Sequence, residues 1–229
     1  MIAHYLRIAA RHINRHKGHA FINIACLSFG MVCCILIMLI VQDSFKVDRF
    51  HENADRIHRV LTIGDYGDRT VSALTQAPLA ASLQESYPEI VYAACYNATD
   101  SGIIKYGAKI FEGGRFSFTD PSFFKMFSFR FLKGNPETVL DDPHSLVITD
   151  DIAEKIFGEK DPVGEILEIQ GFPSLTVTGV IERPMRSHID LSYVVPRQLY
   201  RETGVDIDTW NRYNYTTYLM LREDGSRSI

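Results

Sequence analysis

Residues 21–41 read FINIACLSFGMVCCILIMLIV, and this run contains no charged side chain. At a rise of about 1.5 Å per residue, a helix of this length spans a hydrocarbon core of about 30 Å. The sequence therefore predicts one transmembrane helix, over residues 21–41, near the N-terminus. The segments before and after this helix are then expected on opposite sides of a membrane.

The charges on the two sides of this run differ. Before residue 21 the chain carries only basic charges, at Arg7, Arg11, Arg15 and Lys17. From Asp43 onward acidic residues outnumber basic ones. The positive-inside rule then predicts that the N-terminus lies in the cytoplasm and that everything after Gln42 lies outside a cytoplasmic (inner) membrane.

A cleaved signal peptide is the alternative to a retained helix. The apolar run is longer than an ordinary signal core, and the sequence QDSF that follows Val41 offers no small-residue cleavage site, so we expect a retained helix. The preceding HYLRIAARHINRH, residues 4–16, places apolar side chains at helical spacing with arginines mostly opposite. This pattern predicts an interfacial amphipathic helix on the inner leaflet, with a solvated basic tail as the alternative.

The part beyond the membrane shows short helical and short strand signals in alternation. Helices are expected at residues 78–86, opened by Pro78; at 120–127, with Asp120 as cap; and at 150–157, closed by Gly158. Strands are expected at residues 56–63, 91–98, 102–111, 146–149, 165–170 and 175–181, the last two as a hairpin. The fold class is therefore α+β, with one N-terminal transmembrane helix followed by a mixed α/β extracytoplasmic domain.

The segments follow in the order of a cytoplasmic basic amphipathic segment (1–20), a transmembrane helix (21–41), a stalk (42–60) and an extracytoplasmic domain (61–229). Within the domain, the aromatic residues of the second helix and its surroundings are expected in the core, with an aromatic binding slot as the alternative: Phe123, Phe124, Phe127 and Phe131.

Motifs of the common catalytic classes are missing from this sequence. No phosphate-binding loop is present, because Glu165 stands where its lysine would be, and neither G-x-S-x-G nor H-E-x-x-H occurs. Three of the four cysteines fall in the apolar run, Cys26, Cys33 and Cys34, and Cys95 is expected to be buried and inert. The net charge of -4 disfavours a nucleic-acid partner. We therefore expect no enzyme and no cofactor, and name no catalytic, cofactor-binding or metal site residues.

A few polar residues raise the question of a metal site or another functional site. His188 and Asp190 are two apart and could begin a metal site, but we favour a loop histidine bonded to its own neighbourhood. Asp141 and Asp142 precede a proline and indicate turn chemistry. His51 and His58 are expected at the surface.

Several stretches, taken together, resemble one family. They are residues 8–37, IAARHINRHKGHAFINIACLSFGMVCCILI; 48–60, DRFHENADRIHRV; 119–140, TDPSFFKMFSFRFLKGNPETVL; 145–169, SLVITDDIAEKIFGEKDPVGEILEI; and 176–191, TVTGVIERPMRSHIDL. In this order they are similar to the N-terminal part of MacB/FtsX-like ABC transporter permeases of the Bacteroidetes type. From the first block to the last they run from residue 8 to residue 191, which is most of the length of the chain.

The resemblance implies a MacB-like periplasmic core domain, incomplete here at its C-terminal side, in a permease subunit of the mechanotransmission type. It implies as partners the lipid bilayer, a cytoplasmic ABC ATPase that hydrolyses ATP, a second permease copy and a periplasmic adaptor or envelope protein, with export or efflux as the work. The alternative is a single-span, membrane-anchored extracytoplasmic interaction or sensor module without transport.

Overall fold

The computed structural model describes residues 17–44, 48, 50–65, 69–100, 102–185 and 187–223. These residues divide into two compact units, Met1–Val47 and Asp48–Ile229. The amphipathic helix expected at residues 4–16 lies outside the described residues.

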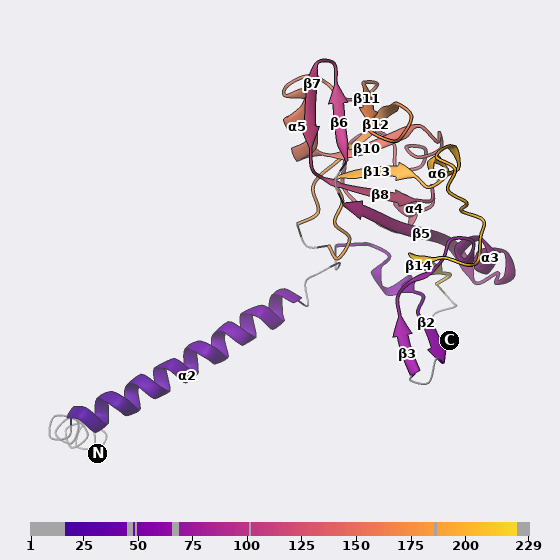
Figure 1. Ribbon diagram of the computed structural model, residues 1–229. Coiled ribbons are helices and arrows are strands. Elements are labelled where there is room, and N and C mark those ends of the chain that lie inside the picture. Colours follow the sequence, from indigo (N-terminus) through magenta and orange to yellow (C-terminus); the bar gives the residue numbers. More distant parts are fainter. Residues whose placement is uncertain are drawn as a thin grey trace. The chain divides into compact units, whose positions relative to one another are not determined.

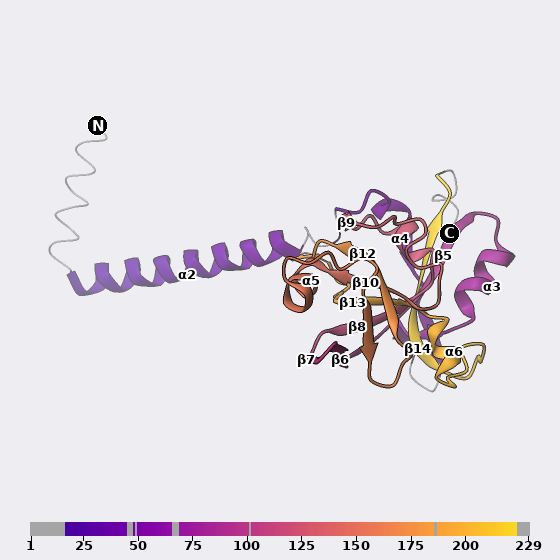
Figure 2. The same cartoon turned by 90° about the horizontal axis from the view of Figure 1, so that it is seen from above.

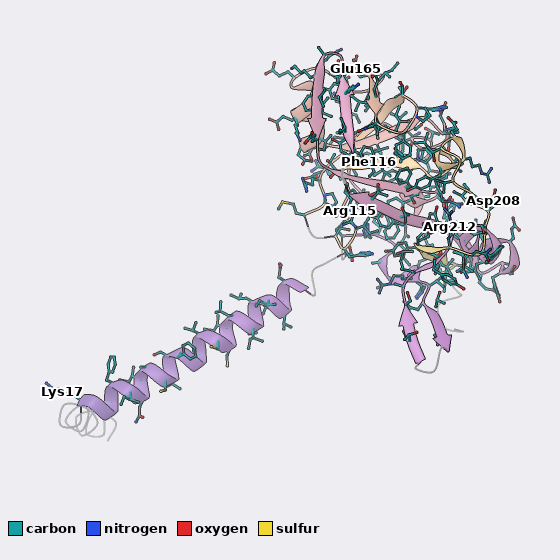
Figure 3. The ribbon with its side chains drawn as sticks, in the orientation of Figure 1. Lys17, Arg115, Phe116, Glu165, Asp208 and Arg212 are labelled. Atoms are coloured by element: carbon teal, nitrogen blue, oxygen red, sulfur yellow. The ribbon has the colours of Figure 1, made fainter. Side chains whose placement is uncertain are left out.

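The first unit is the helix α2, Lys17–Ser44. Its residues 20–43 are long and apolar enough to cross a membrane. Figure 3 shows side chains standing out all around the helix, and its large apolar residues, such as Phe21 and Ile40, are exposed. A helix that is apolar on every side and unpacked is suited to lipid. The helix predicted at residues 21–41 is therefore present, with a few more residues at each end, as a candidate membrane span.

The second unit is built on a sheet of twelve strands (Figure 1). Its order is β1-β14-β5-β8-β13-β10-β12-β11-β6-β7, with β4 beside β14 and β9 beside β12, and β2 and β3 form a separate hairpin. The strands are β1 (Ile57–Arg59), β2 (Thr62–Asp65), β3 (Arg69–Ser72), β4 (Thr75–Gln76), β5 (Ile90–Asp100), β6 (Ile103–Tyr106), β7 (Lys109–Glu112), β8 (Arg115–Thr119), β9 (Phe131–Lys133), β10 (Ser145–Thr149), β11 (Ile166–Ile169), β12 (Leu175–Ile181), β13 (Tyr193–Pro196) and β14 (Tyr213–Leu221).

Short helices lie between these strands (Figure 2). They are η1 (Ala54–Arg56), α3 (Leu79–Ser86), α4 (Phe123–Met126), α5 (Asp150–Phe157) and α6 (Leu199–Glu202). The pairs β10–β12 and β8–β13 are parallel, whereas β1–β14, β5–β14 and β5–β8 are antiparallel. A mixed sheet with short helices confirms the predicted α+β class.

Local signals located several elements correctly. Helix α3 begins after Pro78, α5 ends at Gly158 with φ of 63°, and β11 and β12 form the expected antiparallel hairpin. The phenylalanines predicted for the core are there: Phe123, Phe124 and Phe127 are buried, and Phe131 packs against them.

Three local predictions are wrong. Residues 102–111 form two strands, because Gly107 turns the chain at φ of 58° and β6 folds back on β7. Residues 56–63 contain β1 and the start of β2, which belong to different sheets. Asp120 caps no helix, because its carboxylate accepts the N–H of Cys95 and binds Arg197.

The boundary between the two units falls before Asp48, within the segment expected as a stalk. Residues 50–59 form turns, η1 and β1 on the second unit, which we call the outer unit after its expected place outside the membrane. Of the expected stalk, residues 42–44 continue α2.

Gly134 permits a close approach of two segments and provides a test of the packing between β9 and β12. Its φ is 91°, and a Cβ there would lie 2.6 Å from the carbonyl oxygen of Thr178. We expect Gly134→Ala to lower the free energy of unfolding by about 3 kcal/mol, from left-handed backbone plus a clash with main chain. Gly107→Ala is the matched control: its φ is 58° and nothing lies within 4 Å of the added Cβ, so only about 1 kcal/mol is expected. Equal losses in urea unfolding would contradict this packing.

Candidate functional site

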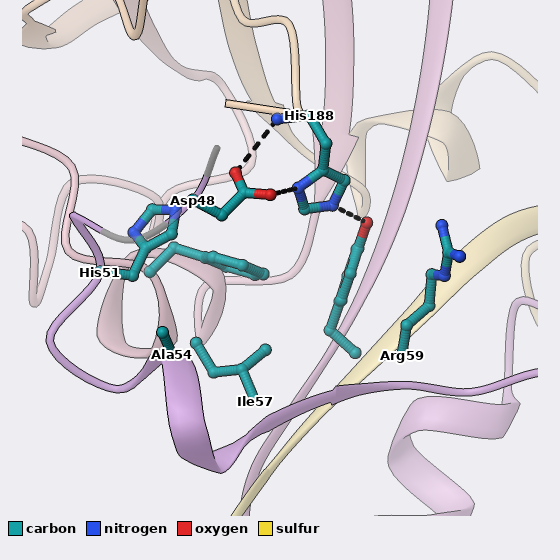
Figure 4. Close-up of a pocket in the computed structure, with 8 residues that line it drawn as sticks. Asp48, His51, Ala54, Ile57, Arg59 and His188 are labelled. Carbon is teal, nitrogen blue, oxygen red and sulfur yellow. Dashed lines mark hydrogen bonds and ion pairs between the residues drawn. The ribbon is translucent and has the colours of Figure 1, made fainter. Parts of the chain in front are cut away.

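A pocket of about 370 Å³ lies where the chain first joins the outer unit (Figure 4). Residues from four parts of the chain meet there. Its lining is Asp48, His51, Ala54, Ile57, Arg59, Phe127, His188 and Tyr218. We call Asp48 and residues 50–56 the leading segment. The other walls are β1, the end of α4, the connection between β12 and β13, and β14.

The leading segment is shaped by a series of tight turns. The N–H of His51 donates to the carbonyl of Asp48 over 3.3 Å, and the N–H of Ala54 donates to the carbonyl of His51 over 3.1 Å. Asp48 has φ of 60°, a left-handed conformation that aspartate tolerates better than most residues. These turns bring the side chains of Asp48 and His51 to the same side of the pocket, as Figure 4 shows.

A chain of hydrogen bonds runs across this pocket. Nδ1 of His188 lies 2.6 Å from Oδ2 of Asp48, and Nε2 of His188 lies 2.7 Å from the hydroxyl of Tyr218. The backbone N–H of His188 also donates to Oδ1 of Asp48 over 3.1 Å. Because a carboxylate only accepts, Nδ1 carries the proton directed at Asp48. The chain links the leading segment to β14 through one imidazole.

The prediction that His188 bonds within its own neighbourhood is wrong. Its partners Asp48 and Tyr218 are 140 and 30 positions away. Asp190 does not join it, and its carboxylate lies 4.0 Å from Arg183. Among the residues that the structure describes, no group of three or more metal-ligating side chains is gathered.

His51 is buried, contrary to the surface position predicted for it, whereas His58 is exposed as expected. Only 4% of His51 is exposed, and neither ring nitrogen has a hydrogen-bond partner among the described residues. Its ring packs against those of Phe50, Phe127 and Phe129 at centroid distances of 4.0, 5.1 and 5.0 Å. Burial lowers the pKa of His51 to about 4, an effect that the nearby charge of Asp48 opposes. The imidazole is therefore neutral near pH 7.

A second, more deeply buried ion pair fixes the centre of the sheet. Arg197 and Asp120 meet at 2.9 Å, with side chains 12% and 14% exposed. Arg197 also donates to the carbonyl of Ala77 over 3.2 Å. Cys95 is buried beside this pair, as predicted, and burial together with the charge of Asp120 raises the pKa of its thiol to about 11. That cysteine is protonated and poorly nucleophilic at neutral pH.

The remaining predicted positions are ordinary. Asp142 accepts the N–H of His144 over 2.7 Å, which is the turn chemistry expected of it. Cys26, Cys33 and Cys34 are free thiols on α2. The sequence pattern missed the pocket itself, because its members come from segments up to 170 positions apart and none of them belongs to a catalytic motif.

Comparison with known proteins gives a family and a fold. The family model of the MacB-like periplasmic core domain matches residues 20–228. Among curated protein sequences no match was found.

Solved structures with a similar fold come from transport proteins. A domain of a protein described as a permease, from Porphyromonas gingivalis, is 22% identical with a TM-score of 0.61, over 75% of each chain. The periplasmic region of MacB from Actinobacillus actinomycetemcomitans is 16% identical with a TM-score of 0.53, over 78% of this chain and 77% of that one. The extracellular domain of the noncanonic ABC-type transporter YknZ, from Gram-positive bacteria, is 14% identical with a TM-score of 0.52, over 73% and 85%. At these identities the likeness establishes the fold.

The buried histidine predicts a pH dependence of stability. Because the pKa of His51 is lowered to about 4 in the folded chain, the unfolded chain binds the proton first as pH falls below about 6.5. The contribution of His51 to stability is complete above pH 6.5 and is lost as pH falls towards 4, by about 3 kcal/mol in all. We expect His51→Phe to remove this part of the slope and to preserve or raise stability at pH 7, since it replaces two unpartnered nitrogens. Urea unfolding of the chain in lipid nanodiscs between pH 4 and 7 measures this slope of stability against pH.

The exposed His58 gives the control. His58→Phe should keep the wild-type slope of stability against pH, and a wild-type slope in His51→Phe would rule out the effect.

Proposed function

Because this chain belongs to the family of MacB-like periplasmic core domains, we propose that it serves in a permease subunit of an ABC transporter of the mechanotransmission type. A separate ATPase in the cytoplasm hydrolyses ATP. The membrane helix carries the resulting movement to the outer unit, which performs export or other extracytoplasmic work.

The observation that carries this proposal is the extent of the family match. It covers residues 20–228, and therefore includes both the apolar helix α2 and the outer unit. A soluble domain of the same fold would lack the helix. The similar folds of the MacB periplasmic region and of the YknZ extracellular domain, both from transporters, support the same role.

The outer unit also has a topology suited to insertion between membrane segments. Its first strand, β1, pairs with its last described strand, β14, through Ile57 and Met220. Nε of Arg56 donates to the carbonyl of Leu221 over 2.8 Å. The two ends of the unit are thus fastened together, and a domain with adjacent ends can be inserted without strain. A movement of either end of the unit would therefore act on the same pair of strands, β1 and β14.

The connection between helix and outer unit is short. Residues 45–47 separate Ser44, the last residue of α2, from Asp48. Four residue steps reach at most about 14 Å when fully extended. A connection of this length limits how far the helix could move without moving the outer unit. We place the N-terminus in the cytoplasm and the outer unit on the far side of the inner membrane, with a second permease copy and a periplasmic adaptor or envelope protein as further partners.

The first test is association with an ATPase. We expect the complete membrane product of the locus, purified in lipid nanodiscs, to retain a protein with a phosphate-binding loop, and its ATP hydrolysis to depend on the membrane part. A product that folds, stays monomeric and retains no ATPase would contradict the proposal and favour the anchored interaction or sensor module.

The second test is orientation. Lys109 is exposed in the β6–β7 hairpin and Lys17 lies at the start of α2. We expect a membrane-impermeant maleimide added to intact spheroplasts to label Lys109→Cys and to leave Lys17→Cys unlabelled until the membrane is opened. Both variants are made in a protein in which Cys26, Cys33 and Cys34 are replaced by serine, so that the maleimide reacts with the introduced thiol. The reverse labelling pattern would invert the topology and exclude the proposed role.

A further inference from the structure

Asp48 lies between two histidines, and its carboxylate bonds only one of them. His188 donates to both oxygens, from its ring Nδ1 over 2.6 Å and from its backbone N–H over 3.1 Å. The backbone N–H of His51 donates to the carbonyl of Asp48 over 3.3 Å, and the two side chains lie next to each other in Figure 4, yet the ring nitrogens of His51 have no partner among the described residues. A buried polar group without a partner is unusual in folded proteins and needs an explanation.

We propose that Asp48 is the moving part of a latch with two positions: in the first its carboxylate bonds His188, as in this structure, and in the second it bonds His51. The first position fastens the leading segment to the β12–β13 connection and, through Tyr218, to β14. In the second position the carboxylate and its partner both belong to the leading segment, three residues apart, so the bond to His188 is released.

The exposure of the pair suits it to release. The side chains of Asp48 and His188 are 30% and 37% exposed, so water can replace the contact at low cost. The pair of Asp120 and Arg197 is 14% and 12% exposed, and separating it would leave buried charges unpaired. The pair of Asp48 and His188 can therefore open and close, whereas the pair of Asp120 and Arg197 stays formed in the folded unit.

Between Asp48 and the sheet, the leading segment is held by the packing of the His51 ring against Phe127 and Phe129 and by a few hydrogen bonds. The N–H of Glu52 donates to the hydroxyl of Ser128 over 3.2 Å, and Asn53 donates to the carbonyl of Met126 over 3.4 Å. From Ile57 onward the β1–β14 pairing holds the chain. Release at Asp48 therefore removes one of these attachments, so that the turns of the leading segment open more often, and it leaves the sheet intact. The pocket beside it provides space for the carboxylate to turn.

The residues of the latch come from stretches that also carry the resemblance to the permease family. Asp48 opens the block DRFHENADRIHRV, which contains His51 as well, and His188 lies in the block that ends SHIDL. The structure brings these two blocks into contact at a hydrogen-bonded pair. A role in coupling the membrane helix to the outer unit rests on the proposed function, whereas the two positions of Asp48 concern the chain alone.

Hydrogen exchange of the full chain in lipid nanodiscs tests the latch. The reporters are the amide protons of Ala54, Arg56 and Ile57, which are bonded within the leading segment. We expect His188→Phe to speed their exchange about threefold or more, as loss of one partly exposed ion pair would. We expect His51→Phe to slow it about threefold or more, because the second position has lost its partner. In His188→Phe the ring nitrogens of His51 should show the ¹⁵N shifts of a hydrogen-bonded imidazole.

His144 supplies the matched control, because it also pairs with a carboxylate, Glu202 at 3.0 Å, away from the leading segment. His144→Phe should leave the three reporter amides unchanged. If His51→Phe leaves their exchange unchanged, Asp48 and His188 form a static clamp and the latch is wrong. If His188→Phe speeds hydrogen exchange at the amides of β10 and β12 as much as at the three reporter amides, the variant unfolds globally. That result would also overturn the latch. If His188→Phe does not fold, His188→Gln replaces it under the same criteria.

The exchange result does not depend on any ATPase. Should the exchange pattern hold while no ATPase associates with the complete product, the latch stands and the proposed function fails. Should an ATPase associate while both variants exchange like wild type, the function stands and the latch fails.

Discussion

The antiparallel pairing of β14 with both β1 and β5 is the constraint on which the outer unit depends. It joins the last described strand to the first, with Tyr218 opposite Arg59 on one side and Ala94 on the other. The hydroxyl of Thr217 in β14 also lies 2.7 Å from that of Thr75 in β4, and both side chains are fully buried. Without β14 the leading segment would have no strand to join, and His188 would lose the hydroxyl that orients its ring.

The two ion pairs divide the unit into a rigid part and an adjustable part. Asp120 and Arg197 connect β5, β13 and the start of α3 through groups that are almost fully removed from water. Removal of either partner would leave a buried charge, so this region has one stable arrangement. The pair of Asp48 and His188 lies at the surface, where alternative arrangements differ little in free energy. Rigidity in the sheet and freedom at its edge are what a unit needs if it is to be moved as a whole.

The sequence could predict what depends on neighbouring residues. The apolar helix α2, α3, α5 and the β11–β12 hairpin follow from hydropathy, from proline and glycine positions and from alternation, and the structure contains all four. The division of residues 102–111 into two strands was missed because one glycine with positive φ decides it. The pocket was missed for another reason. Asp48, His188 and Tyr218 are ordinary surface-type residues until strand pairing brings them together, and no local pattern encodes that pairing.

His51 shows how burial and strand order together create a property that the sequence conceals. In the polar run DRFHENADRIHRV a histidine is expected in water, yet the turns that begin at Asp48 direct it among Phe50, Phe127 and Phe129. A phenylalanine would fill the same aromatic site without leaving two nitrogens unpartnered. An imidazole at this point therefore contributes less to stability than the apolar ring that would fit there. What it adds is a donor and an acceptor within reach of the carboxylate that binds the leading segment to the sheet. In the proposed latch, the donor of His51 finds its acceptor when the carboxylate of Asp48 moves.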